Sequence, residues 1–324
     1  MKLLLPLLMT SVLGVTASGV FAQAPVSEGQ MSEEQMSAES MSEPKMSDEQ
    51  MSDEQMAEPA MSADTMMESE MMQADHFDHG LFDQILAKHL VAKDGGQSTW
   101  VDYAKIQAES ADTLDQYLAA LSAVSAEQFN DWPQSEQLAF LINAYNAWTI
   151  QLIIDNYPGI DSIRDLGTWI KSPWKKSFIP LLGETLSLDD IEHGRIRAEG
   201  VYQDPRIHFA VNCASIGCPP LRTEAFTGDK LDQQLTEQTQ LFLMDSSRNR
   251  VDGKKLELSS IFKWYRGDFE KGWLGYQSLS AFLYDYRQAL GLNEQQSAQL
   301  KAEDFKIRFL DYDWNLNDVK NLPQ

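Results

Sequence analysis

Positive charge is scarce in this sequence. Its 324 residues hold 26 Lys and Arg against 49 Asp and Glu, which gives a formal net charge of −23 at pH 7. A chain this acidic repels nucleic acid and anionic membrane surfaces. We therefore predict no nucleic-acid partner, and the sequence indicates no other partner and no cofactor.

Long apolar runs are also rare, and the only one that stands out is residues 3–20. Lys2 precedes this run, and the small residues Ala22 and Ala24 follow it. This order is typical of a secretory signal peptide, so we expect residues 1–22 to be cleaved off. An uncleaved anchor helix is the alternative. No later segment is apolar enough to span a bilayer, and the sequence predicts a periplasmic or secreted protein.

Aromatic residues are absent between residues 25 and 75. Met recurs there at every fifth position from Met31 to Met71, with Ser, Glu and Asp between. Such a segment buries too little apolar surface to offset its ordering entropy, so we expect residues 23–75 to be a disordered acidic linker. Thioethers can bind Cu(I), but this spacing is wide and a solubilising role is favoured.

The remaining residues, 76–324, read as one globular domain. Apolar residues at helical spacing predict helices over residues 111–124 and 135–156, and the second is apolar nearly all round and therefore buried. Alternation and turn formers predict a short hairpin around Gly183 at residues 178–188, and strands at residues 206–212 and 306–314. We predict an α+β fold: a helix-rich single domain with a small mixed or antiparallel sheet.

Two histidines stand three residues apart at the edge of this domain. His76 and His79 have a spacing that could bind a stray metal ion. Beside a predicted helix they are more simply interpreted as a solvated helix start.

Cysteine is limited to Cys213 and Cys218. In an oxidising compartment such a pair predicts a disulfide. A structural zinc site with His193 and His208 is a second interpretation. A free nucleophilic thiol is the third.

Several motifs of the domain are similar to those of a known family. They are EQLAFLINAYNA at residues 136–147, LDDIEHG at 188–194, DPRIHFA at 204–210, Cys213, CPPL at 218–221 and DYDWNLN at 311–317. Together they resemble the family catalogued as domain of unknown function 547. The resemblance covers about residues 76–317, and it implies no activity because none is established for the family.

A catalytic site can still be sought from side-chain chemistry. A thiolate nucleophile needs an imidazole to take its proton and a third group to orient the imidazole. We assign these roles to Cys213 and His193, with Glu192, Asn143 or Asn146 as the orienting group. The two amides lie on one face of the buried helix, where tying down neighbouring loops is the favoured interpretation.

Other polar residues near the cysteines are predicted to contribute to binding. They are Arg206, His208, Asn212, Ser215 and Cys218. In an extended strand, five residues would place His208 about 16 Å from Cys213 on the opposite face, which makes it a poor base. No metal is assigned. The leading hypothesis is a thiol-dependent hydrolase or acyl transferase; the alternative is a non-catalytic binding or scaffold module whose Cys loop is a disulfide or structural zinc site.

Overall fold

The computed structural model describes residues 76–168 and 171–323. The predicted signal peptide and acidic linker fall on residues 1–75, outside the described residues. Within the described ranges, no helix is long and apolar enough to cross a membrane.

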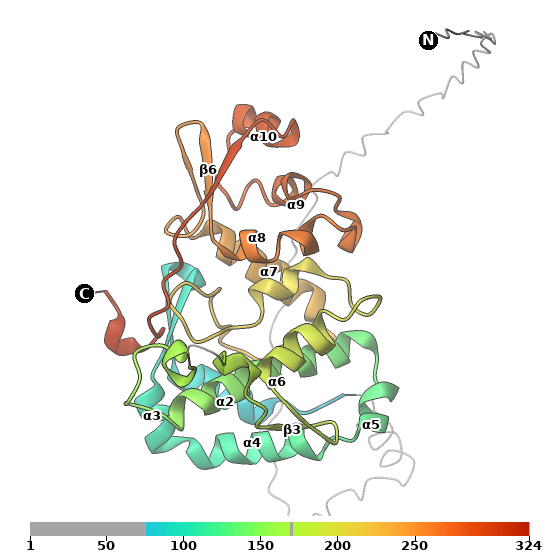
Figure 1. Ribbon diagram of the computed structural model, residues 1–324, viewed down its shortest axis with the longest axis vertical. Helices are drawn as coiled ribbons and strands as arrows, with labels where there is room; N and C mark the ends of the chain where they lie inside the picture. The colour runs from blue at the N-terminus through green and yellow to red at the C-terminus, as the bar shows by residue number, and fades with distance from the viewer. Residues whose placement is uncertain (1–75, 169–170, 324) are drawn as a thin grey trace, which may run out of the picture. The chain divides into compact units, whose positions relative to one another are not determined.

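Helices form most of the regular structure (Figure 1). Those before the Cys loop are α2 Gly80–His89, α3 Tyr103–Glu109, α4 Ala111–Ala123, α5 Ala126–Asp131 and α6 Gln134–Ile154. Those after it are α7 Leu231–Met244, α8 Ile261–Trp264, α9 Leu279–Asp285 and α10 Glu294–Lys301. The predicted helices at 111–124 and 135–156 are confirmed as α4 and α6. Most of α6 is buried, as its nearly uniform apolar surface predicts.

The strands form three small sheets. Their bounds are β1 Leu90–Lys93, β2 Ser98–Val101, β3 Ile179–Leu181, β4 Glu184–Leu186, β5 Arg250–Asp252, β6 Lys255–Leu258 and β7 Lys306–Phe309. β1–β2 and β3–β4 are antiparallel pairs, whereas β6 pairs antiparallel with β5 and parallel with β7. The α+β prediction is confirmed, and β3–β4 is the predicted hairpin.

The closing strand is shorter than predicted. β7 ends at Phe309, and only the Leu310 amide still donates to Leu258 on β6, at 2.8 Å. The chain then turns toward the Cys loop, where the Asp313 carbonyl accepts from Gly217 and the Asn315 carbonyl from Ile216. Pairing with this loop replaces the continuation of the strand.

Two hydrophobic cores fill the domain. The larger core surrounds α6 and takes side chains from α2 to α5 and from the β3–β4 hairpin. The smaller core is built from α7, α8, α9 and the β6–β7 pair, with Phe209 reaching into it. In Figure 1, α2 to α6 lie in the lower part, α8 to α10 in the upper part and α7 between them, and α7 gives side chains to both cores. The segments between α6 and α7 therefore connect the two cores.

The interpretation of His79 as solvated is wrong. Its side chain is buried, and Nδ1 lies 2.7 Å from the hydroxyl of Tyr117 on α4. Burial lowers the pKa of His79 from 6.5 to about 3, so the ring is neutral. His76 is exposed, in agreement with the prediction.

Candidate functional site

A pocket of about 220 Å³ lies where segments of both cores meet. Five residues predicted for the site line it: Glu192, His193, His208, Cys213 and Cys218. Six aromatic residues also line it, namely Tyr145, Trp174, Trp264, Tyr265, Tyr312 and Trp314. The structure thus brings together the cysteine and histidine segments, which are separate in sequence.

Glu192 and His193 reach the pocket from a short π-helix, η4, Asp190–Ile196. Ser187 and Asp190 cap its start reciprocally: each backbone amide donates to the other side chain. At its end the Arg197 amide donates to the Glu192 carbonyl five residues earlier, at 2.9 Å. Single π-turns of this kind are frequent at functional sites.

The predicted strand at 206–212 is wrong. Residues Pro205–Phe209 form a 3₁₀ helix, η5. Pro205 occupies its first turn, and the Asp204 carboxylate caps it by accepting from the Arg206 amide at 2.9 Å. The alternation of polar and apolar residues wrongly indicated a half-buried strand, because the polar and the apolar side chains of this segment are all buried. The objection that an extended chain separates His208 from Cys213 therefore no longer applies.

Cys213 and Cys218 form a disulfide with a Cα–Cα distance of 6.2 Å. The predicted disulfide is thus the alternative that the structure supports, and sulfurs in this state are not the thiolates that a zinc site requires. The Cys213 sulfur also contacts the hydroxyls of Ser215 at 3.0 Å and Tyr312 at 3.1 Å. Ser215, which belongs to the Cys loop, is buried and does not line the pocket.

Tyr312 also explains the glycine in the Cys loop. A Cβ on Gly217 would lie 2.9 Å from ring carbons of Tyr312, closer than a side chain tolerates. The absent side chain at Gly217 therefore makes room for this tyrosine.

His208 is held by a carboxylate that the sequence analysis missed. Its Nε2 lies 2.7 Å from Oδ2 of Asp268, and its ring stacks on Tyr265 with centroids 3.9 Å apart. Burial would raise the pKa of Asp268, but contacts with His208, Arg197 and Lys271 hold that pKa well below its usual range. An ionised carboxylate can only accept hydrogen bonds, so the Nε2 of His208 must carry the proton that it donates to Asp268.

The other nitrogen of His208 is left without a partner. Nδ1 is buried and has no hydrogen bond among the described residues. Burial lowers the pKa of His208 and outweighs the opposing effect of Asp268, so the ring is neutral and Nδ1 keeps its lone pair. An imidazole oriented by a carboxylate, with one basic nitrogen unoccupied, is the arrangement that general bases use.

His193 is occupied differently. Its Nδ1 lies 2.6 Å from Nη1 of Arg197, whose Nε donates to Asp268 at 2.6 Å. A guanidinium can only donate, so the Nδ1 lone pair of His193 is engaged. Its predicted role as base would require Arg197 to move first.

Glu192 lies buried beside these histidines. Its Oε1 accepts a hydrogen bond from the Tyr265 hydroxyl at 2.7 Å and lies 3.9 Å from His193 Nδ1. Burial and this carboxylate raise the pKa of Tyr265 above its ordinary value. Glu192 therefore orients a tyrosine of the pocket wall.

Asn143 and Asn146 on α6 hold loops, as favoured in the sequence analysis. The Asn143 amide donates to the Phe226 carbonyl at 2.7 Å and accepts from the Phe226 amide at 3.0 Å. Asn146 donates to the Ala210 carbonyl and accepts from the Asn212 amide. Both side chains are buried and absent from the pocket lining, and their described hydrogen bonds all go to the backbone, not to a histidine.

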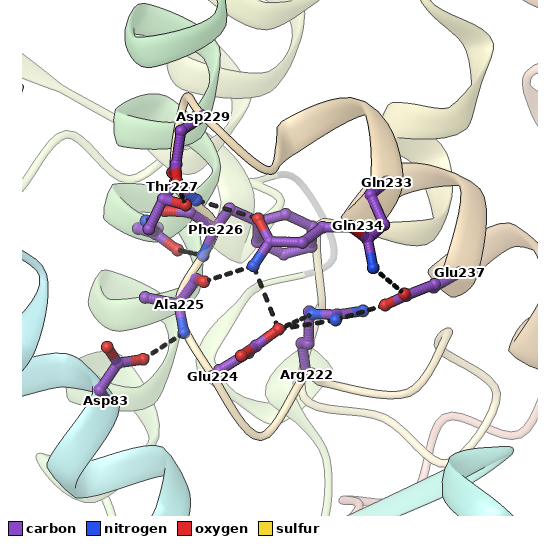
Figure 2. Close-up of polar contacts among 11 residues, drawn as sticks. Asp83, Arg222, Glu224, Ala225, Phe226, Thr227, Asp229, Gln233, Gln234 and Glu237 are labelled. Atoms are coloured by element: carbon purple, nitrogen blue, oxygen red, sulfur yellow. Dashed lines mark hydrogen bonds and ion pairs between the residues drawn. The ribbon is translucent and has the colours of Figure 1, made fainter. Parts of the chain in front are cut away.

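The loop that Asn143 anchors is braced by further polar contacts (Figure 2). Gln234 donates to the Ala225 carbonyl, Asp83 accepts from the Ala225 amide, and Arg222 binds Glu224 and Glu237. These contacts position the start of α7. They lie outside the pocket and explain the loop's shape without a ligand.

Two more residues predicted for binding serve the fold. Arg206 is ion-paired with Asp204 and Asp232, both at under 3 Å. Asn212 donates to the Pro219 carbonyl and accepts from the Ala214 amide, each at 2.8 Å, so it closes the Cys loop from inside. Neither residue lines the pocket.

The middle of the chain also matches a known family model. Residues 129–243 match DUF547, described as a protein of unknown function. The predicted resemblance is confirmed over these residues, and the DUF547 region includes α6, η4, η5 and the disulfide. The pocket residues Trp264, Tyr265, Tyr312 and Trp314, and Asp268 behind them, follow that region. No curated protein and no solved structure matches the chain.

Sequence reasoning assigned none of the pocket residues that follow the DUF547 region, and it also missed Tyr145, Trp174 and Asp189 within it. Asp268 lies in a charged stretch, between Arg266 and Glu270, so no local pattern distinguishes it from a solvated acid. Tyr312 and Trp314 lay within a quoted motif but received no role.

Proposed function

We propose that this pocket is the active site of a thiol-dependent hydrolase or acyl transferase whose resting form is the Cys213–Cys218 disulfide. One observation carries the proposal: the pocket is lined by this disulfide and by His208, whose ring is paired with Asp268 and whose Nδ1 has no partner among the described residues. His208 replaces His193 as the proposed base, because the Nδ1 of His193 already faces Arg197.

The proposed cycle begins with reduction. A dithiol reductant supplies two electrons and two protons, becomes a disulfide itself and leaves two thiols. Within the described residues no hydrogen bond joins the Cys213 sulfur to a histidine, so the freed side chain has to turn toward His208. His208 then takes the thiol proton, with Asp268 holding the ring.

The acyl step follows from these groups. The Cys213 thiolate attacks the substrate carbonyl carbon and forms a C–S bond. The bond to the leaving group breaks, and the leaving group receives the proton from His208. Water, or an acceptor nucleophile in a transferase, then gives its proton to His208 and attacks the thioester, which releases the acyl group and restores the thiol.

The proposed location is outside the cytoplasm, in the periplasm or secreted. Two features support it: the apolar run after Lys2 and the disulfide, a bond that persists mainly in oxidising compartments. Cleavage after Ala22 belongs to the same proposal.

Thiol labelling after reduction tests the enzyme proposal. With dithiothreitol removed, iodoacetamide at pH 7 should alkylate Cys213 about tenfold faster than Cys218, because a paired imidazole increases the thiolate fraction. His208→Gln should remove this advantage, while His193→Gln should retain most of it. Peptide mass spectrometry reads each site, and circular dichroism confirms that the variants fold.

A second candidate is a non-catalytic binding module in which the disulfide shapes the pocket. The intact disulfide itself favours it, because in that state Cys213 offers no nucleophile. Equal labelling of both cysteines in the reduced protein, with no effect of His208→Gln, would refute the enzyme and leave this candidate.

A further inference from the structure

One wall of the pocket is made of four aromatic rings in mutual contact: Trp174, Trp264, Tyr312 and Trp314. We call these residues the aromatic wall. The ring centroids of Trp264 and Tyr312 lie 5.7 Å and 4.5 Å from that of Trp314. Trp264 is 47% exposed although it is large and apolar. Exposed ring faces beside a pocket are suited to contact with a bound group.

The aromatic wall already contacts one cation, Arg164, which does not line this pocket. The guanidinium carbon of Arg164 lies 5.2 Å from the ring centroid of Trp314. Indole faces attract cations through the ring quadrupole, and the attraction grows when the site excludes water. The chemistry of this wall is therefore compatible with a positively charged group.

Asp189 and Glu192 give the pocket its negative charge. The described residues that line it include these two carboxylates and no lysine or arginine. Of the described Lys, Arg and His side chains, only His193 lies within 4 Å of either carboxylate, and its Nδ1 is already in contact with Arg197. Nearby Arg197 and Lys271 are instead ion-paired with Asp268.

This arrangement leaves the buried Glu192 carboxylate without a direct ion pair to Lys or Arg among the described residues, and Arg197 acts on it only from a longer distance. Glu192 is only 5% exposed, and its described hydrogen bond comes from the neutral Tyr265 hydroxyl. Buried carboxylates are costly unless an opposite charge lies close. A ligand cation between the aromatic wall and these carboxylates would supply that charge, whereas an anionic ligand would add repulsion.

We propose that this pocket binds a ligand through an ammonium group, which lies against the aromatic wall and is neutralised by Glu192 and Asp189. The proposal rests on the proposed function in taking this pocket as the substrate site, and it makes the substrate an amine-bearing acyl compound. At about 220 Å³ the pocket accepts a small molecule or one end of a larger one.

Choline and its neutral isostere 3,3-dimethylbutan-1-ol test this inference on the oxidised protein. The two probes have the same shape and differ in charge. Choline should quench tryptophan fluorescence with a Kd about tenfold or more below that of the alcohol, in line with a desolvated cation–aromatic contact. Equal affinities for the two probes would overturn the proposal.

Variants locate the binding. Glu192→Gln and Trp264→Leu should each weaken choline binding about tenfold, whereas Glu127→Gln, an exposed carboxylate on α5, should leave it unchanged. Choline binding that survives both pocket variants lies elsewhere and contradicts the inference.

The oxidised protein separates this test from that of the enzyme. No free thiol takes part in choline binding, so the two tests are independent. If choline does not bind but Cys213 still shows His208-dependent labelling, the ammonium ligand is refuted and the enzyme proposal stands. If choline binds but Cys213 shows no such labelling, the enzyme proposal is refuted and the ammonium ligand stands.

Discussion

The amide pair on α6 and the polar side chains of the pocket differ in how fully their hydrogen-bonding groups are used. Asn143 and Asn146 each donate and accept through the amide, always to backbone groups of loops far away in sequence. In the pocket, His208 Nδ1 has no partner among the described residues, and Glu192 has no direct ion pair to a described Lys or Arg.

This difference separates two uses of buried polarity. A saturated amide fixes the position of a loop and contributes to a unique fold. An unsaturated nitrogen or carboxylate beside a cavity costs stability in the free protein but remains available to a ligand or a proton. Side chains of the first kind should therefore matter for folding, and those of the second kind for function.

Replacing Asn143 with Leu should have the largest effect on folding. The change leaves the Phe226 amide and carbonyl buried without partners and should lower the free energy of unfolding by about 3 kcal/mol. Urea denaturation measures the loss. Asn130→Leu, an exposed asparagine on α5, is the control and should change stability by less than about 0.5 kcal/mol. A similar small change for both would show that α6 amides do not hold the loop.

His79 sharpens the comparison because it resembles His208 but lies away from the pocket. It is also buried, and its Nε2 has no partner among the described residues. An unpartnered nitrogen alone therefore does not mark a functional site; the adjoining cavity distinguishes His208.

The pH dependence of stability should reveal the burial of His79. Its folded pKa of about 3 lies below the unfolded value of 6.5, so the unfolded chain binds the proton more readily. Its contribution is fully present above pH 6.5 and is lost as the pH falls toward 3, by about 2 kcal/mol at pH 5. His79→Gln should flatten the slope of unfolding free energy between pH 6.5 and 5, and His76→Gln, which alters an exposed histidine, should not. Identical slopes in the two variants would contradict a buried neutral His79.

The sequence predicted much of the fold because local patterns decide it. The apolar residues of α4 and α6 recur at helical spacing, and Gly183 separates the two halves of the β3–β4 hairpin. At residues 206–212 the pattern failed, since alternation reports one buried face and this segment is buried on all sides. The hydrogen bond that the Asp204 side chain accepts from the Arg206 amide, and the fixed φ angle of Pro205, favour a 3₁₀ helix instead.

The candidate site was predicted only in part, because its members meet through tertiary packing. Cys213, His193 and Glu192 stood out as reactive types, and all line the pocket. The partner of His208, however, lies 60 residues away on the other core, and no local spacing links it to that histidine. The roles of Asp268 and Tyr265 follow from the contact between the two cores, which the sequence patterns do not specify.

Two glutamates of equal burial provide the finest test of the comparison. Glu136 and Glu192 are each 5% exposed. Glu136 accepts backbone hydrogen bonds from Phe77 and Gly228, one on each carboxylate oxygen. In Glu136→Gln an NH2 group replaces one of these oxygens, so one backbone N–H faces another donor and loses its acceptor. That variant should lose about 1–3 kcal/mol of unfolding free energy.

Glu192→Gln should cost almost nothing. The new amide oxygen still accepts from Tyr265, while a buried charge that no described Lys or Arg contacts directly disappears. We expect its unfolding free energy to lie within about 0.5 kcal/mol of the parent or above it. Urea denaturation of both variants at pH 7 measures the difference. If Glu192→Gln proves as destabilising as Glu136→Gln, the Glu192 carboxylate supports the fold, and its availability for an ammonium ligand loses its physical basis.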